Sequence, residues 1–275
     1  MKNLSFILFA NFILLLACEE VPVFDETQQR PVVQAFLYAD EAVDSIQLTT
    51  LVPFGSESEE APPITNAQLK ISSAGEEYVL SHLEEKAGYY AYSGSNLEIK
   101  VGQTYQLSFE YNGELVSAET TVPTPPQHLS LEVEEIFLPQ ISSQEDLFTN
   151  RELMQQTIAL DWDYEEGAYY YVLIENLEDD PEPINQLDIN FAPFARFISA
   201  PSQDNFMSIR PLLQFQSFGT HRIRVYKLNE EYAKLYESLE QDSRNLNEPY
   251  SNIQNGLGIF TAFSSQEVFL EVVKQ

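Results

Sequence analysis

The chain has 275 residues, with 14 Lys and Arg against 43 Asp and Glu, a formal net charge of −29, and 44% hydrophobic residues. This apolar content is enough for the cores of one or two domains, while the charge excludes a basic groove for nucleic acid, whose phosphates are bound by clustered Lys and Arg. The single cysteine excludes an intrachain disulfide, a CxxC motif and a zinc site built from thiolates.

Residues 1–17 are predicted to be a lipoprotein signal peptide. Lys2 supplies positive charge, residues 4–16 are almost wholly apolar, and the small Ala17 precedes Cys18. The apolar run is shorter than the about 20 residues that a membrane-spanning helix needs. The run ending at Cys18 resembles a bacterial lipobox, in which the cysteine thiol is lipidated and the preceding peptide is removed. The alternative is an ordinary cleaved signal followed by an incidental buried thiol.

Residues 18–30 are predicted to be a lipidated spacer, and residues 31–122 an N-terminal β-sandwich. From Val32 onward, about seven short runs rich in β-branched and aromatic residues are separated by turn signals, which is typical of a sandwich. Asn112-Gly113 predicts a tight hairpin, because both central residues of a type I′ turn need φ > 0. The Pro-rich residues 123–127 are predicted to be a linker, since proline cannot continue a strand ladder.

Residues 128–275 are predicted to form a C-terminal β-sandwich with one helical insertion. Strands are expected at residues 214–218 and 221–228. In the second of these, alternation places His221, Ile223 and Val225 on one face, opposite Arg222, Arg224 and Tyr226. The fold class is therefore mainly β, with two sandwiches of immunoglobulin-like or fibronectin-III-like character.

The helical insertion is predicted near residues 229–244. Asn229 suits the N-cap, and the acidic residues after it suit the positive end of the helix dipole. Apolar residues recur along one stripe: Tyr232, Leu235, Tyr236 and Leu239. We expect this stripe to pack on its own sandwich, the usual role of an amphipathic helix, and a partner protein is the alternative.

The sequence carries no HExxH, GxSxG or Walker motif, so no catalytic residue is assigned and the chain is predicted not to be an enzyme. The histidines His82, His128 and His221 are interpreted as strand or loop residues. The dispersed acidic clusters favour a solvated surface, with calcium binding as the alternative, although no cluster has EF-hand spacing. No metal or other cofactor is expected.

Aromatic residues raise a second choice between core and interface. The tyrosines at 89–92 and 169–171 could line an interface, where tyrosine is enriched. Alternation along a strand places about half of them inward in any case, so filling of the core is the favoured interpretation. Asp161-Trp162-Asp163 is likewise interpreted as a core tryptophan between solvated carboxylates, ahead of a ligand site.

The run from Glu248 to Phe260 resembles the C-terminal signature of a lipoprotein family of Bacteroidota known as domain of unknown function 4249. Weaker matches extend along nearly the whole mature chain, at residues 31–35, 64–67, 102–105, 120–123 and 228–232. The signature contains Asn252, Asn255, Gly256, Gly258 and Phe260. These residues are candidates for a ligand-binding or partner-binding loop, and a turn that closes the fold is the alternative.

The resemblance implies a function and a location. Such families are typically encoded beside TonB-dependent receptors, which implies a non-catalytic accessory role in nutrient capture or receptor gating, with the receptor as partner. It also implies a lipid anchor in the outer membrane. Glu19-Glu20 after the cysteine resembles an acidic export signal and favours the cell surface over the periplasmic side. The alternatives are a surface hydrolase acting on glycan or peptide, and a structural envelope protein.

Overall fold

The computed structural model describes residues 30–52, 60–187, 196–239 and 249–275, apart from the side chain of Leu147. Several predicted features lie outside these ranges: the signal peptide, Cys18, the spacer up to residue 29 with its Glu19-Glu20 pair, and the last part of the predicted helix, residues 240–244. No helix within the described ranges is long and apolar enough to cross a membrane.

Strands dominate the described chain, which confirms the prediction of a mainly β fold. The strands of the first half are β1 (Pro31–Tyr38), β2 (Ile46–Thr50), β3 (Lys70–Ser73), β4 (Glu76–Val79), β5 (Ser81–His82), β6 (Tyr89–Ala91), β7 (Thr104–Tyr111) and β8 (Glu114–Thr121). Those of the second half are β9 (Ser130–Leu131), β10 (Glu135–Leu138), β11 (Ile158–Asp161), β12 (Tyr169–Asn176), β13 (Phe197–Ile198), β14 (Phe206–Ile209), β15 (Gly219–Leu228) and β16 (Leu257–Lys274). The helices are α2 (Gln144–Thr149), the 3₁₀ helix η2 (Arg151–Gln155), α3 (Pro211–Gln214) and α4 (Glu230–Leu239).

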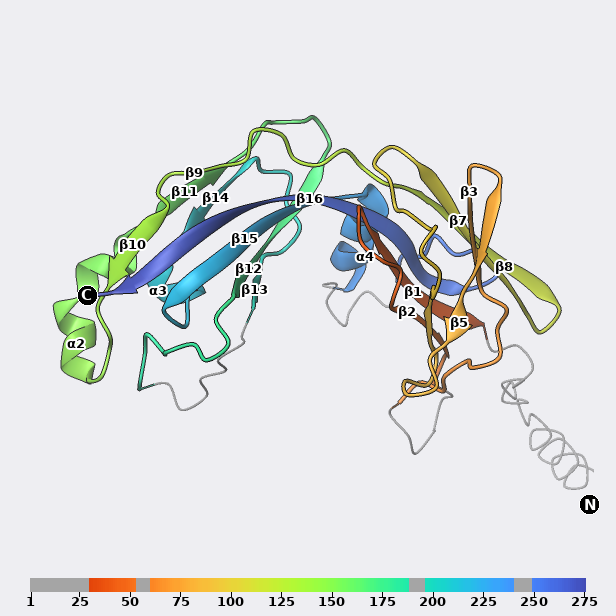
Figure 1. Cartoon of the computed structure of the whole chain (residues 1–275), viewed down its shortest axis with the longest axis horizontal. Helices are drawn as coiled ribbons and strands as arrows, with labels where there is room; N and C mark the ends of the chain where they lie inside the picture. The colour runs from red at the N-terminus through yellow and green to blue at the C-terminus, as the bar shows by residue number, and fades with distance from the viewer. Residues whose placement is uncertain (1–29, 53–59, 188–195, 240–248) are drawn as a thin grey trace, which may run out of the picture.

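The largest sheet runs through the whole molecule (Figure 1). Its nine strands follow the order β13-β12-β15-β16-β1-β2-β6-β5, with β10 paired to β16 in addition. A sheet of order β4-β3-β7-β8 covers one half of it, and a sheet of order β14-β11-β9 covers the other. The result is two β-sandwiches, here the first lobe and the second lobe, which stand at the two ends of an arch spanned by β16 (Figure 1).

The core of the first lobe follows from the alternation of side chains along its strands. Val33, Ala35 and Leu37 of β1 are all fully buried, whereas the residues between them point to the other face of the sheet. Across the sandwich they share a core with Tyr105 and Leu107 of β7. Burial of each such side chain stabilises the fold by about 1.5–3 kcal/mol.

The second lobe has a separate core on the same face of the nine-stranded sheet. Val172 and Ile174 of β12 lie beside Ile223 and Val225 of β15, and Leu160 faces them from the smaller sheet. The predicted alternation along residues 221–228 is therefore confirmed, with the arginines on the face away from the core.

The last strand, β16, belongs to both lobes. It pairs in parallel with β1 from Leu257 to Phe263 and antiparallel with β15 from Phe263 to Val272. Phe260 and Ala262 accordingly lie in the first core, together with Ile253. The sequence prediction places residues 249–263 in the second sandwich, whereas the structure uses them to complete the first. Periodicity identifies a strand but not its neighbours, which explains the difference.

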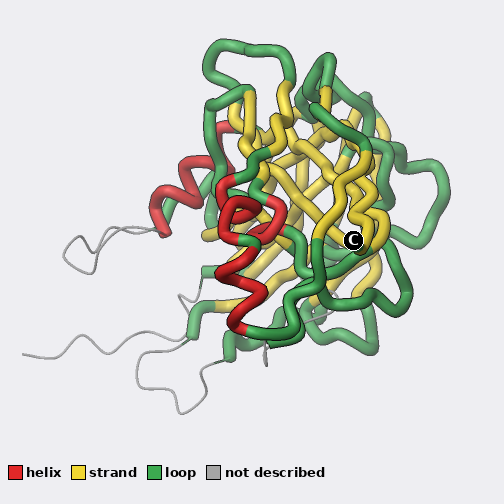
Figure 2. The backbone as a smooth tube through the Cα atoms, turned by 90° about the vertical axis from the view of Figure 1, so that its left-hand side faces the viewer, coloured by secondary structure: helices red, strands yellow, loops and turns green. Residues whose placement is uncertain are grey.

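Short helices account for the other differences from the sequence prediction, which contains only one helix (Figure 2). α2 begins at a capping box, in which the Ser143 hydroxyl accepts from the Asp146 amide at 3.2 Å and the Asp146 carboxylate accepts from the Ser143 amide at 2.8 Å. The strand predicted at residues 214–218 is wrong: Pro211 opens α3 at the first helical turn, where its fixed φ is favourable.

The hairpin predicted at Asn112-Gly113 is confirmed. These two residues have φ of 51° and 82° and join β7 to β8 with Tyr111 opposite Glu114. The positive φ values at both central positions are those that a type I′ turn requires.

Replacing Gly258 by alanine should destabilise the protein strongly. Gly258 has φ of +95°, and a Cβ atom there would lie 2.0 Å from the carbonyl oxygen of Val33 in the adjacent strand. We expect Gly258→Ala to lower the free energy of unfolding by roughly 3 kcal/mol or more, measured by urea denaturation. Gly113→Ala is the control, because φ is +82° there but nothing lies within 4 Å, and it should cost roughly 1 kcal/mol. Equal losses in the two variants would contradict the close approach of β1 and β16.

Candidate functional site

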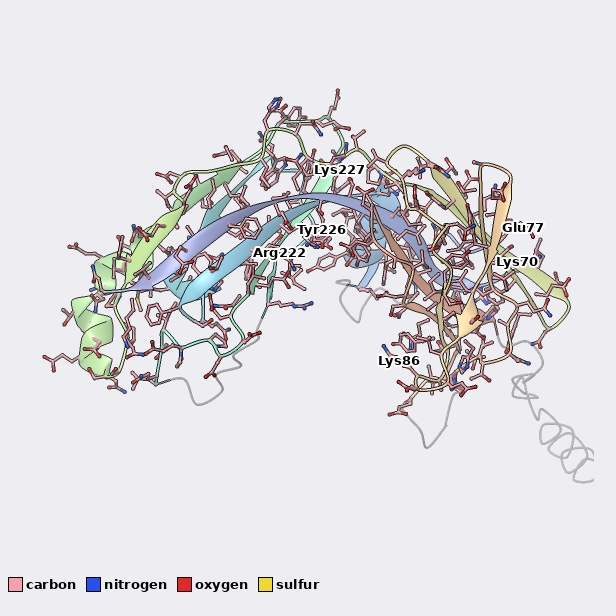
Figure 3. The ribbon with its side chains drawn as sticks, in the orientation of Figure 1. Lys70, Glu77, Lys86, Arg222, Tyr226 and Lys227 are labelled. Atoms are coloured by element: carbon pink, nitrogen blue, oxygen red, sulfur yellow. The ribbon has the colours of Figure 1, made fainter. Side chains whose placement is uncertain are left out.

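The nine-stranded sheet has a second face, which points away from both cores and toward the inside of the arch. We call it the inner face; in Figure 3, Arg222 and Tyr226 lie on this side of the sheet and Lys227 on the other. It is formed by alternate residues of the central strands: Val32, Gln34, Phe36 and Tyr38 of β1, Leu257, Ile259, Phe263 and Glu267 of β16, Arg222, Arg224 and Tyr226 of β15, and Tyr171 and Glu175 of β12.

Helix α4 covers the middle of the inner face and is attached to the first lobe. The Glu231 carboxylate accepts hydrogen bonds from the hydroxyls of Thr120 in β8, at 3.2 Å, and Thr261 in β16, at 3.4 Å. The Asn229 side-chain amide donates to the Thr120 hydroxyl at 3.0 Å and to the Thr121 carbonyl at 2.9 Å. The helix predicted as an insertion of the second sandwich therefore lies over the junction: it is bonded to β8 of the first lobe, and its Ala233 shares a buried cluster with Tyr226 and Leu228 of the second.

An aromatic cluster fills this junction. We call it the junction cluster; its members are Phe36, Tyr38, Tyr171, Tyr226, Tyr232 and Phe263. The ring of Tyr38 stacks on Phe263 at 5.1 Å between centroids, and Tyr171 stacks on Tyr226 at 4.7 Å. Tyr232 of α4 meets Phe263 edge-on at 5.1 Å. Because these rings come from both lobes and from α4, their packing fixes the lobes relative to each other.

Burial keeps the tyrosines of the junction cluster protonated. Desolvation, and then the neighbouring Tyr226, raise the pKa of Tyr38 to about 12. The pKa of Tyr171 is raised still further, mainly by burial and then by Tyr38. At neutral pH these side chains are therefore neutral phenols that can donate hydrogen bonds.

Arg224 adds an electrostatic connection beside the cluster. Its guanidinium donates to the Tyr226 hydroxyl at 2.7 Å, to the Glu267 carboxylate of β16 at 3.1 Å and to the Glu41 carboxylate at 3.3 Å. Glu41 lies in the loop after β1, so the arginine links the second lobe to the first. Glu175 is almost buried nearby and is paired with Arg222 and with Arg196.

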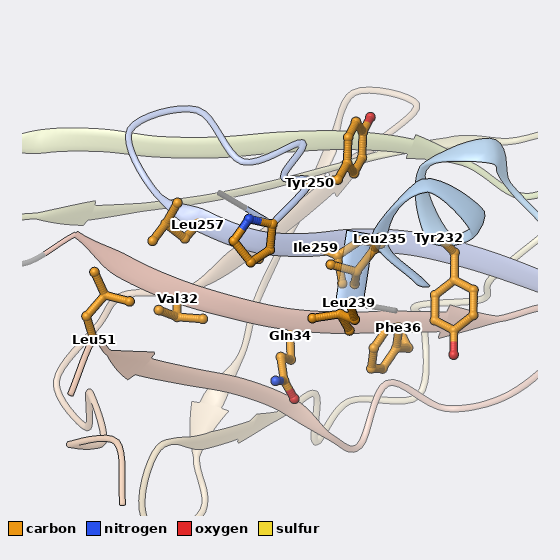
Figure 4. Close-up of a pocket in the computed structure, with 12 residues that line it drawn as sticks. Val32, Gln34, Phe36, Leu51, Tyr232, Leu235, Leu239, Tyr250, Leu257 and Ile259 are labelled. Carbon is orange, nitrogen blue, oxygen red and sulfur yellow. The ribbon is translucent and has the colours of Figure 1, made fainter. Parts of the chain in front are cut away.

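Between α4 and the start of the sheet the inner face is hollowed into an apolar groove of about 410 Å³ (Figure 4). We call it the α4 groove; it is lined by Val32, Gln34, Phe36, Leu51, Tyr232, Leu235, Leu239, Pro249, Tyr250, Leu257, Gly258 and Ile259. Its polar groups are one amide, on Gln34, and the hydroxyls of two tyrosines, and none of the described residues that line it is charged. This volume and this composition are typical of a binding site for an apolar group.

The predicted apolar stripe of α4 is divided between two environments. Tyr232 lies in the junction cluster, Leu235 is half-buried in the groove, and Leu239 is 66% exposed at the rim. The buried apolar residue of the helix is instead Ala233. The expectation that the whole stripe packs on the chain's own core is therefore wrong at Leu239, because this end of the helix borders the open groove.

The residues predicted for a binding loop are placed side by side, and their polar groups hold the turn together. The Asn252 side chain makes two hydrogen bonds with the backbone of Phe260, at 2.8 and 3.0 Å. The Asn255 amide donates to the Leu115 carbonyl at 2.9 Å, and Gly256 packs closely against neighbouring atoms. These contacts favour the closing-turn interpretation, although Gly258 also lines the α4 groove. A binding role for this loop stays a prediction.

Each of the three histidines has a contact that fits a structural role. The His82 imidazole accepts from the Gly88 amide at 3.1 Å, and the exposed His128 is paired with Asp163 at 2.7 Å. His221 is buried, and its ring bonds to the Gly219 carbonyl at 3.0 Å. In the described parts of the chain no three His, Cys, Asp or Glu side chains gather in a way that could hold a metal ion.

The aromatic residues singled out in the sequence are divided between the cores and the inner face. Tyr90 is buried in the first core, and its hydroxyl donates to the Ile64 carbonyl at 3.0 Å. Trp162 is a buried core residue of the second lobe. Tyr171, by contrast, reaches the inner face. The groove residues of β1, and Leu51 just after β2, carried no signal of their own in the sequence, since only the pairing of β1 with β16 brings β1 to α4.

Comparison with known proteins adds the family. Residues 19–268 match the family model described as a domain of unknown function (DUF4249). The chain belongs to this family. The resemblance found in the sequence is thereby confirmed.

Other comparisons add nothing about function. A search of the curated proteins gave no match. Among solved structures, a cytokine receptor complex aligns over 88% of this chain and 95% of its own, at 11% identity and a TM-score of 0.26. Domains A168-A170 from titin align over 90% of this chain and 67% of their own, at 8% identity and a TM-score of 0.21. Similarities this low carry no argument.

Truncation of two residues of α4 should change the stability of the protein by very different amounts. Tyr232→Ala removes a ring from the junction cluster and should lower the free energy of unfolding by about 2–3 kcal/mol, measured by urea denaturation. Leu239→Ala, at a position that is 66% exposed, should change it by less than about 0.5 kcal/mol. A large loss in Leu239→Ala would show that the end of the helix is packed in the core.

Acid should destabilise the second lobe through His221. Burial lowers the pKa of this imidazole to about 4 from an ordinary value of 6.5. The unfolded chain therefore binds more protons between these two pH values, and the free energy of unfolding should fall as the pH is lowered through that window, by at most about 1.4 kcal/mol per unit. Denaturation curves at a series of pH values should show a smaller decline for His221→Asn. A decline of the same slope in both proteins would rule out this contribution.

Proposed function

We propose that this chain is a lipid-anchored, non-catalytic binding protein of the outer membrane, which acts as an accessory to a TonB-dependent receptor. The observation that carries the proposal is the inner face of the nine-stranded sheet. The junction cluster and Arg224 join the two lobes at the middle of this face, and beside them, in the first lobe, the face opens into the α4 groove. A preformed apolar groove on a rigid support suits binding, because little ordering entropy is lost when a partner docks.

The contacts of the polar residues support binding over catalysis. The arginines of the inner face are engaged by carboxylates, and the tyrosines are held neutral by burial. These groups therefore maintain the shape of the surface. The nearby groove offers apolar area and a few hydrogen-bonding groups, which are the means by which a surface recognises a partner.

The sequence supports the place of action. The run Leu15-Leu16-Ala17-Cys18 has the form of a lipobox, and one acidic pair follows the cysteine. Two or three acyl chains hold a protein firmly on a membrane, whereas one chain alone does not. A lipid at Cys18 would attach the protein, and with it the binding surface, to the membrane that contains the receptor.

Purification of the tagged protein from gently solubilised membranes should recover a receptor barrel in stable proportion. The Cys18→Ala protein should not be labelled by a fatty-acid analogue and should recover the barrel poorly, because it is released or left unprocessed. Quantitative mass spectrometry of the eluates measures both effects.

Repeated recovery of the wild-type lipoprotein without a receptor would contradict the accessory role. Persistent labelling of Cys18→Ala by the fatty-acid analogue would contradict lipidation at this cysteine. The two readouts are independent, so each part of the proposal can fail alone.

A further inference from the structure

Both walls of the α4 groove carry apolar surface that the described residues, 30–52, 60–187, 196–239 and 249–275, leave uncovered. On the helix side Leu235 is half-buried and Leu239 is 66% exposed; on the sheet side Leu51 is 44% exposed. Burying one leucine side chain contributes about 1.5–3 kcal/mol, so a partner that covered these exposed walls would gain binding free energy from their burial. Contiguous apolar surface of this kind marks an interaction site.

The floor of the groove has no backbone groups to offer an extended peptide. β1 is paired on one side with β16, through Val32 opposite Leu257 and Gln34 opposite Ile259, and on the other side with β2. An extended chain lying there would lose the hydration of its amides without gaining partners. A helix satisfies its own backbone, and a hydrocarbon chain has none to satisfy.

The exposed rim distinguishes a helix from a hydrocarbon chain. A single hydrocarbon chain on the floor would leave Leu239 in water, because 66% of that residue is exposed. A second helix beside α4 would cover both the floor and the rim. The groove-facing residues Tyr232, Leu235 and Leu239 are spaced at i, i+3 and i+7, so they extend over about two helical turns, the length over which a partner helix could pack.

Charge defines the partner further. The chain has a net charge of −29, and α4 itself carries three glutamates against the single Lys234, which is paired with Glu230 at 3.1 Å. Such a surface repels an acidic segment and attracts a basic one. The groove also begins at Val32, fourteen positions after Cys18, so its first residue lies within about 50 Å of the proposed anchor.

From these observations we infer that the α4 groove binds an amphipathic helix with a basic polar face, presented by a protein of the same membrane. The apolar stripe of this helix packs between Leu235 and Leu239 on one side and Val32 and Leu51 on the other. The inference rests on the proposed function, because it names the part of the receptor that docks.

The test places the photo-crosslinking residue p-benzoylphenylalanine at position 239 of the full-length lipoprotein in its native membrane. The same residue at position 213 is the matched control, since Leu213 is 63% exposed and lies in α3 of the second lobe. Mass spectrometry of the crosslinked peptide from position 239 should show a segment with apolar residues at helical spacing and a net positive charge. The same peptide should not be found from position 213.

A second arm measures recovery of the receptor. Leu239→Asn should lower the amount recovered by about tenfold, as for loss of an apolar side chain that the partner helix buries, while Leu213→Asn should leave it unchanged. Both leucines are exposed, so neither change should prevent folding.

The other outcomes contradict either the inference or the proposed function. Crosslinks from position 239 to lipid, to an acidic or extended segment, or to nothing would overturn it. Equal recovery of the receptor by Leu239→Asn and the wild type would overturn it while leaving the accessory function standing. Absence of the receptor from the wild-type eluate would instead remove the accessory function, and the crosslinked peptide would still identify the class of occupant.

Discussion

The hydrogen bonding of one strand holds the molecule together. β16 is parallel to β1 in the first lobe and antiparallel to β15 in the second, without a break between the two pairings. Because side chains alternate strictly along a strand, the unbroken β16 gives both lobes a core on one face and a common inner face on the other. The junction cluster, the contact of Arg224 with Glu267 and the floor of the α4 groove all depend on this alignment.

Local signals in the sequence predicted the elements well and their partners poorly. The hairpin at Asn112-Gly113 and the two faces of residues 221–228 follow from short-range rules, so both were predictable. Parallel pairing of β1 with β16 leaves no local signature, because it joins the two ends of the described chain. For the same reason the start of the helix was predicted to within one residue, but its attachment to β8 through Glu231 was not.

The candidate site shows the same limit. The stripe of α4 and the tyrosines near residue 170 were interpreted as core, with an interface as the alternative. Only three-dimensional pairing brings Val32, Leu51 and Leu257 to the helix. The residues of the C-terminal signature were candidates for a binding loop, yet the side chains of Asn252 and Asn255 form hydrogen bonds with the backbone of the chain itself. Its Gly258 serves the close approach of two strands. A specific sequence signature can therefore reflect how the turns and strands of the fold pack together.

The place of Ile253, Phe260 and Ala262 in the first core also determines the order in which the protein can mature. In most chains with two domains the N-terminal one can fold while the rest is still being made. Here the N-terminal strands β1–β8 lack part of their core until nearly the last residues have been synthesised. The first lobe can therefore complete its core only after β16 has been synthesised and has paired with β1.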